Sequence, residues 1–206
     1  LTPELPLLSE ESRALPWPVR SSWRTYWLVD PLDGTKEFVK RNGEFTVNIA
    51  LIHDHEAVLG VVHVPVSGVT YLAARGAGAH KILAGGEKQP ISVRTPAATP
   101  LRVVGSRSHP SPGLAAYLDK LGDVEMVAMG SSLKFCLVAE GEADIYPRLG
   151  PTSEWDTAAA QAVVECAGGR VLTGDGKALA YNCKDDILNP YFIVTGDTAK
   201  IWPPLN

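Results

Sequence analysis

Near the start of the chain lies the stretch Tyr26-Trp27-Leu28-Val29-Asp30-Pro31-Leu32-Asp33-Gly34-Thr35. Its compact apolar beginning predicts a buried β-strand that delivers the carboxylate of Asp30 at its C-terminal end. Pro31 presets the backbone, and Gly34 lets a ligand approach the main chain closely. Asp30 and Asp33 can then point into one cleft, where the carbonyl between them adds a neutral oxygen. Hard oxygen ligands in this number favour Mg²⁺.

The end of this stretch predicts a second kind of ligand. Gly34 and Thr35 would open the next helix, where free N–H groups favour a phosphate. The hexapeptide from Asp30 to Thr35 is equally compatible with an ordinary turn followed by a helix cap. It is not an EF-hand loop, because the alternating acidic pattern and the terminal Glu are absent.

Outward from this stretch, the pattern predicts two architectures in succession. Residues 1–24 are rich in Pro, Ser and charge and are expected to form a loop. Strands are then expected at 26–29, 45–52, 57–64 and 68–74, with a hairpin loop at 53–56 and a further strand at 91–94. After Pro100, strands at 102–105, 124–128, 143–146, 169–172 and 191–195 alternate with helices at 113–121, 131–140 and 153–167. We therefore expect an α+β subdomain over 1–98 and an α/β subdomain over 99–206.

Two further segments carry carboxylates. Ser153-Glu154-Trp155-Asp156-Thr157-Ala158-Ala159 places Asp156 in the first turn of a helix, where an Asp commonly compensates the helix dipole. Leu8-Ser9-Glu10-Glu11 is a polar segment whose glutamates, taken alone, would be solvated. Together with Asp30 and Asp33, however, Glu10 and Asp156 make four carboxylates beside a phosphate-binding helix start. That combination indicates a phosphoesterase in which two cations clamp the attacking and leaving oxygens.

Composition excludes several classes of function. The 206 residues carry a net charge of −4, and no basic stretch suggests a nucleic-acid partner. No apolar run is long enough for a membrane span, and no signal peptide is evident. Three cysteines without C-x-x-C spacing argue against a disulfide framework or zinc ribbon. We therefore expect a cytoplasmic protein, either free or peripheral on the inner face of the membrane.

Three weaker patterns are not taken as evidence of a functional site. Gly76-Ala77-Gly78 lacks the third glycine and the following helix of a dinucleotide fingerprint. His53 and His55 could chelate a metal, but they are expected to be exposed loop histidines. No serine lies in a G-x-S-x-G elbow, so a serine hydrolase has little support.

The three carboxylate segments, with Lys36-Glu37-Phe38 following the first of them, resemble the motifs of the inositol monophosphatase superfamily. Lys36-Glu37-Phe38 resembles its 3′(2′),5′-bisphosphate nucleotidase branch, as do the stretches 105–109 and 130–136. The resemblance covers nearly the whole chain and implies a layered αβαβα sugar-phosphatase-like fold. The chain begins with Leu1 rather than Met. We therefore expect an N-terminal helical part, which would cover the site and supply a supporting Asp, to be absent from this sequence.

The resemblance implies a role for each motif residue. Glu10, Asp30 and the Leu32 carbonyl would hold one Mg²⁺, and Asp30, Asp33 and Asp156 a second, with a third left open. The backbone of Gly34 and Thr35 would cradle the scissile phosphate, and the Thr35 hydroxyl would position the attacking water. This assigns catalytic roles to Glu10, Asp33 and Thr35, and puts Leu32, Asp33 and Asp156 in contact with substrate.

The resemblance also implies a nucleotide pocket. Its expected residues lie at loop-to-helix junctions after strands, where ligands bind in α/β sheets. Three of them offer cations for a second phosphate. The full set is Ser106, Arg107, His109, Ser131, Ser132, Lys134 and Arg148.

The activity expected from the resemblance is Mg²⁺-dependent hydrolysis of adenosine 3′,5′-bisphosphate to AMP and phosphate, inhibited by Li⁺. It extends to 3′-phosphoadenylyl sulfate and implies a place in sulfur assimilation. One alternative is an inositol or fructose-bisphosphate phosphatase on the same scaffold, against which Lys36-Glu37-Phe38 argues. Another is a metal- and nucleotide-binding sensor without turnover, against which the intact set of four carboxylates argues. The sequence gives no oligomeric state.

Overall fold

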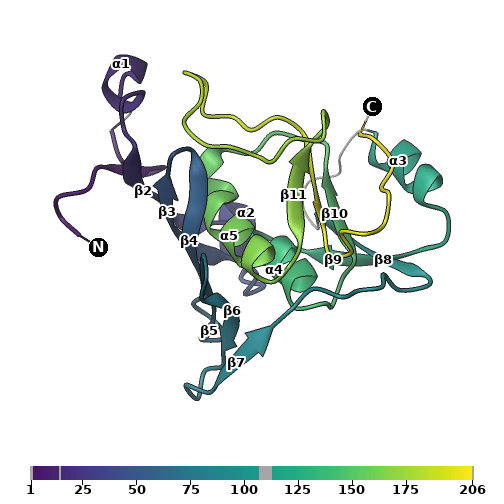
Figure 1. The fold of residues 1–206 in the computed structure, drawn as a ribbon. Coiled ribbons are helices and arrows are strands. Elements are labelled where there is room, and N and C mark those ends of the chain that lie inside the picture. The colour runs from purple at the N-terminus through teal and green to yellow at the C-terminus, as the bar shows by residue number, and fades with distance from the viewer. Residues whose placement is uncertain (1, 14, 107–112, 206) are drawn as a thin grey trace.

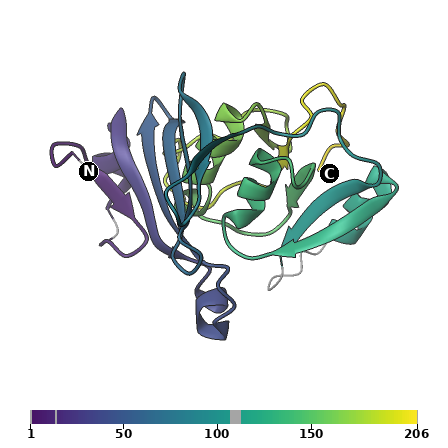
Figure 2. The same ribbon diagram turned by 90° about the horizontal axis from the view of Figure 1, so that it is seen from below.

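Two β-sheets, with helices between and beside them, make up the molecule (Figure 1). The computed structural model describes residues 2–13, 15–106 and 113–205. Seen from below, the first sheet, two central helices and the second sheet follow one another as layers (Figure 2). Among the residues described, no helix has both the length and the apolar character needed to cross a bilayer.

The first sheet is an antiparallel meander with one parallel strand at its edge. Strand β1 (Leu7–Ser9) runs parallel to β2 (Thr25–Asp33), and each later neighbour pair is antiparallel. The meander continues through β3 (Thr46–His53), β4 (Glu56–Val64), β5 (Val69–Ala74), β6 (Gly78–Ile82) and β7 (Lys88–Ile91). Alternate residues of β2 to β4 are buried, as expected for strands with one face on the core.

The second sheet has the order β11-β12-β10-β8-β9. Its strands are β8 (Leu101–Ser106), β9 (Val124–Met129), β10 (Ile145–Arg148), β11 (Arg170–Thr173) and β12 (Phe192–Thr195). The three strands β9, β8 and β10 are parallel, so their carboxyl ends lie at the same edge. Helix α3 (Leu114–Leu121) packs on one face of this sheet through Tyr117, and α4 (Leu133–Ala139) packs on the other through Phe135.

The central layer consists of α4 and α5 (Ala158–Cys166), and it joins the two sheets into one core. Helix α5 is built from small residues and lies directly against β4. At Gly60 the approach is so close that an added Cβ would lie 2.0 Å from the carbonyl oxygen of Ala159. Glycine at this position lets the helix that follows Asp156 pack against the sheet that carries Asp30.

The layered α+β fold agrees with the expectation, but several segments differ. Residues 1–24 were expected to be loop, yet they contain β1 and the short helix α1 (Trp17–Arg20). The strand expected at 91–94 is β7, displaced toward the N-terminus by its pairing with β6. The helix expected at 153–167 begins as a 3-10 turn, η1 (Glu154–Asp156), before α5. The subdomain boundary near residue 98 stays a prediction, because the central core draws residues from both sheets.

The contact at Gly60 leads to a stability prediction. Gly60→Ala forces β4 and α5 apart, because the new methyl group meets backbone atoms that cannot rotate away. We expect the free energy of unfolding to fall by about 1–3 kcal/mol in urea denaturation. In the matched control, Gly85→Ala, no atom lies within 4 Å of the added carbon, and the change should stay within about 0.5 kcal/mol. Equal effects of the two substitutions would contradict this packing account.

Candidate metal centre and its cleft

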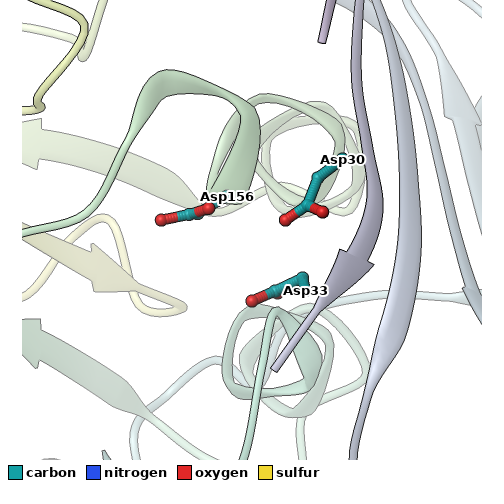
Figure 3. A group of neighbouring side chains, drawn as sticks. All are labelled: Asp30, Asp33 and Asp156. Atoms are coloured by element: carbon teal, nitrogen blue, oxygen red, sulfur yellow. The ribbon is translucent and has the colours of Figure 1, made fainter. Parts of the chain in front are cut away.

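Three aspartates lie together where the first sheet meets the central helices. Asp30 and Asp33 come from the end of β2, and Asp156 comes from η1 (Figure 3). Each offers a carboxylate oxygen, and these oxygens lie within 4.8 Å of one another. In a regular strand, residues three apart point to opposite faces. The pairing of β2 with β3 shifts register between Asp30 and Asp33, which accounts for both side chains reaching the same space.

Asp30 is a buried carboxylate that lacks a full set of partners. Asp30 is only 1% exposed to solvent. Its Oδ1 accepts a hydrogen bond from the Leu32 N–H at 2.9 Å. Its Oδ2 is buried, with no hydrogen-bond donor among the described residues. Burial, and after it the negative charge of Asp33, raises the pKa of Asp30 well above the ordinary value for an aspartate. A bound cation would supply the missing partner for this oxygen.

Asp156 is oriented by a local capping box. Its Oδ2 accepts the backbone N–H of Ser153 at 2.8 Å, and the Ser153 side chain bonds back to the turn. Burial is the main cause that raises the pKa of Asp156, and the charge of Asp33 adds to it. Asp156 therefore interacts with the start of the helix, as expected for a first-turn aspartate. Its carboxylate also faces Asp30 and Asp33.

Glu10 lies at the edge of this group rather than inside it. It follows β1 directly, and its N–H donates to the Val29 carbonyl at 3.3 Å, next to Asp30 in the neighbouring strand. Its residue is exposed, yet its negative charge is one of the causes that raise the pKa of Asp30 and of Asp156. The structure therefore brings three of the four expected carboxylates into direct proximity and the fourth into their neighbourhood.

The donor set fits a hard divalent cation. The aspartate oxygens are the donors that Mg²⁺ prefers. The unpartnered Oδ2 of Asp30 needs a positive group to offset its burial. No Lys or Arg forms an ion pair with these three aspartates within the described part of the chain.

A cleft of about 780 Å³ opens beside the aspartates. It is lined by most of the residues expected to bind substrate: Asp33, Gly34, Thr35, Ser106, Ser131, Ser132, Lys134, Arg148 and Asp156. Gly34 has a φ of 92°, a left-handed conformation that favours glycine, and it stands at the N-terminus of α2 (Thr35–Lys40). Arg107 and His109, which were also expected here, lie outside the described residues.

Three basic residues, Lys36, Lys134 and Arg148, line the cleft, and the last two lie close enough to influence each other. Lys134 is only 7% exposed, and its Nζ donates to the Ser131 carbonyl and stands over the Tyr146 ring. Burial lowers the pKa of Lys134 to about 8, and the nearby charge of Arg148 acts in the same direction. Arg148 donates to the Pro151 carbonyl at 2.7 Å, while its buried Nε has no partner among the described residues. An anion bound between Lys134 and Arg148 would offset their mutual repulsion and would give the Arg148 Nε a hydrogen-bond acceptor.

Several cleft residues were not anticipated from the sequence. Phe135, Tyr146, Leu149, Gly150, Pro151, Thr152, Thr157 and Tyr191 also line the cleft. They come from α4, from β10 and the loop after it, from the start of α5 and from the residue before β12, and their meeting depends on the order of strands in the second sheet. Asn48 is a polar residue in the apolar alternation of 46–52, which is the one sequence signal that marks it. It pairs in register with Asp30.

A model of the inositol monophosphatase family matches residues 1–201. The 3′(2′),5′-bisphosphate nucleotidase CysQ of Salmonella typhimurium is 56% identical over 195 residues, which cover 95% of this chain and 77% of that protein. Among solved structures, CysQ from Bacteroides thetaiotaomicron aligns with a TM-score of 0.86 at 45% identity, covering 94% of this chain and 77% of its own. An inositol monophosphatase from Anabaena (Nostoc) sp. PCC 7120 gives 0.77 at 25% identity, covering 96% and 75%.

The raised carboxylate pKa values lead to a pH prediction. Without metal, the folded state holds protons on Asp30 and Asp156 that the unfolded chain releases near its ordinary aspartate pKa, about 3.9. The contribution of Asp30 and Asp156 to folding stability therefore falls as the pH rises above the pKa of the unfolded chain. Mg²⁺ competes with these protons, so its stabilising effect should grow with pH.

Thermal unfolding with and without Mg²⁺ tests this. We expect the Mg²⁺-induced rise in Tm to be larger at about pH 8 than at about pH 5.5, by roughly 2–4 °C per kcal/mol of added stabilisation. Asp156→Asn should reduce the difference between the two pH values. A Mg²⁺-induced rise that does not change with pH would contradict the raised pKa values.

Proposed function

The chain belongs to the inositol monophosphatase family, and on that premise we propose that it is a 3′(2′),5′-bisphosphate nucleotidase acting on adenosine 3′,5′-bisphosphate. The products are AMP and phosphate. The observation that carries the proposal is the polarity of the cleft. The carboxylates of Asp33 and Asp156 line it, and so do the cations Lys134 and Arg148. A molecule with two phosphates matches such a cleft, one phosphate held through metal ions and the other by the cations.

In this proposal the acidic residues hold two Mg²⁺ ions, and a third is left open. Glu10, Asp30 and the Leu32 carbonyl hold one ion, while Asp30, Asp33 and Asp156 hold the other. When bound, the ions supply activation of water and neutralisation of phosphate charge. The orphaned Oδ2 of Asp30 and the clustering of three carboxylate oxygens support this assignment.

The chain's own groups position the reactants. The backbone N–H groups of Gly34 and Thr35 donate to the oxygens of the 3′-phosphate, and the Thr35 hydroxyl orients the attacking water. The water oxygen bonds to phosphorus as the bond between phosphorus and the 3′-oxygen breaks, and a proton from the water ends on the 3′-oxygen, which gives AMP and phosphate. Gly34 and Thr35 both line the cleft next to Asp33, which supports their assignment.

The cations bind the 5′-phosphate. Lys134 and Arg148 offer charge-assisted hydrogen bonds at a site where they otherwise repel each other. Ser106 and Ser131 also line the cleft and are proposed to contact the nucleoside. 3′-Phosphoadenylyl sulfate carries the same 3′-phosphate and a 5′-anion, so it is proposed as a second substrate. The cytoplasmic location expected from the sequence and a role in sulfur metabolism belong to the same proposal.

An inositol phosphate is the competing substrate on this fold. The identity with the Salmonella and Bacteroides CysQ proteins, 56% and 45%, is well above the 25% with the Anabaena inositol monophosphatase. The cations Lys134 and Arg148 in the cleft wall also suit an anionic group better than the neutral hydroxyls of a polyol. Both observations favour the nucleotide.

Phosphate release by the full-length protein tests the metal assignment. We expect turnover of adenosine 3′,5′-bisphosphate with Mg²⁺ and none after EDTA. Asp33→Asn should lower kcat by about 100-fold or more, which corresponds to roughly 2.7 kcal/mol of transition-state stabilisation. The control Asp175→Asn, on an exposed turn away from the cleft, should keep wild-type kcat. Near-normal kcat in Asp33→Asn would refute the two-metal assignment, and cleavage of inositol phosphates alone would refute the nucleotide.

The cation site is tested by comparing two substrates. Removing a charge-assisted contact costs about 1.5–3 kcal/mol, so Lys134→Ala and Arg148→Ala should each raise KM for adenosine 3′,5′-bisphosphate by about 10- to 100-fold. KM for 3′-AMP, which lacks the 5′-phosphate, should change little. Lys177→Ala, an exposed lysine paired with Asp175, is the matched control and should leave both KM values unchanged. Equal losses on both substrates would contradict a 5′-phosphate site.

A further inference from the structure

The two oxygens of the Asp33 carboxylate have very different surroundings. Oδ2 accepts the Ser132 backbone N–H at 2.6 Å and the Ser132 hydroxyl at 2.6 Å. It also accepts the Asn48 side-chain amide and the Thr46 hydroxyl, each at 3.3 Å. Among the described residues no hydrogen-bond donor reaches Oδ1. One oxygen is therefore saturated with donors, and the other is left free.

Asn48 and Ser132 also bond to each other, so they act on Asp33 as a pair. The Asn48 Nδ2 donates to the Ser132 Oγ at 2.8 Å, which uses the second of its two N–H groups. The Ser132 Oγ lies 2.7 Å from the Asp156 carbonyl, a third possible partner. This side-chain bridge links β3, the start of α4, the end of β2 and the η1 turn. It therefore touches every element that carries an aspartate of the cluster.

We propose that Asn48 and Ser132 are positioning residues that hold Asp33 Oδ2 so that Oδ1 is presented to a divalent cation. The proposal rests on the metal role that the proposed function gives to Asp33, and it deepens that function. It also gives Ser132 a different task from the substrate contact expected from the sequence, because its hydroxyl is already engaged by protein groups.

Burying the polar side chain of Asn48 costs folding free energy, which indicates that asparagine has a functional role at this position. Asn48 is 1% exposed, and its Oδ1 has no partner within the described part of the chain. An unpaired buried acceptor destabilises a protein, so an apolar residue in this strand would fold at least as well. The opposite orientation of the amide would place Oδ1 against the Asp33 carboxylate, so the donors must face it. The polar side chain is then explained by its two donated hydrogen bonds.

Magnesium binding, measured by calorimetry and by the Mg²⁺ dependence of Tm, tests the proposal without relying on turnover. In the full-length protein, Asn48→Ala and Ser132→Ala should each raise the Kd for Mg²⁺ by about 10- to 100-fold, the usual effect of removing a group that orients a metal ligand. The metal-free Tm of Asn48→Ala should stay at or above the wild-type value. An unchanged Kd in both variants would overturn the proposal.

A double-variant comparison separates positioning from general weakening. If Asn48 acts through Asp33, then Asn48→Ala should add no further loss of Mg²⁺ affinity in an Asp33→Asn background. The matched control is Asn182→Ala, because Asn182 is equally buried but its side chain exchanges hydrogen bonds with Arg20 rather than with an aspartate of the cluster. Its metal-free Tm should fall while its Kd for Mg²⁺ stays at the wild-type value. An equal loss of affinity from Asn48→Ala in both backgrounds would overturn the proposal.

The same measurements distinguish this inference from the proposed function. A wild-type protein that binds Mg²⁺ with the predicted dependence on Asn48 and Ser132, yet cleaves no bisphosphate, would refute the nucleotidase and leave the positioning role standing. If Asp33→Asn itself leaves the Kd for Mg²⁺ unchanged, Asp33 is not a ligand and the positioning role fails.

Discussion

Mutual repulsion among Asp30, Asp33 and Asp156 is the constraint on which the rest of this structure depends. Carboxylate oxygens held within 4.8 Å of one another, one of them in a residue almost wholly buried, oppose folding in their charged form. The fold opposes that repulsion with a backbone donor to one oxygen of each carboxylate, from Leu32 to Asp30, from Ser132 to Asp33 and from Ser153 to Asp156. A cation bound among the remaining oxygens would offset the rest of the repulsion.

Packing of the two sheets on a shared helical layer keeps the cluster in place. The η1 turn with Asp156 runs straight into α5, and α5 approaches β4 so closely that only Gly60 fits beneath Ala159. The same layer includes α4, which carries Ser132 at its start and Lys134 in its first turn. The aspartate cluster and the cationic wall of the cleft are thus fixed by one continuous core, and a change in that core would move both together.

Many of the strands and helices could be predicted from the sequence, because local patterns of apolar and turn residues specify them. The apolar strand running to Asp30, the hairpin of β3 and β4 and the alternation after Pro100 were visible in periodicity and turn residues, whereas β6 (Gly78–Ile82) was not predicted. The register shift that turns Asp33 toward Asp30 was not, since it arises from pairing with β3. Strand β1, only three residues long, is likewise a strand through its pairing with β2. The engagement of the Ser132 hydroxyl by Asp33 depends on three segments meeting, which no single segment reveals.

Anomalous diffraction from crystals of the full-length protein, soaked with Mn²⁺ and AMP, tests the central claim most directly. The account predicts manganese peaks among the carboxylates of Asp30, Asp33 and Asp156, with the AMP phosphate against Lys134 and Arg148. Manganese absent from the three aspartates, or AMP bound with its phosphate away from both cations, would contradict it.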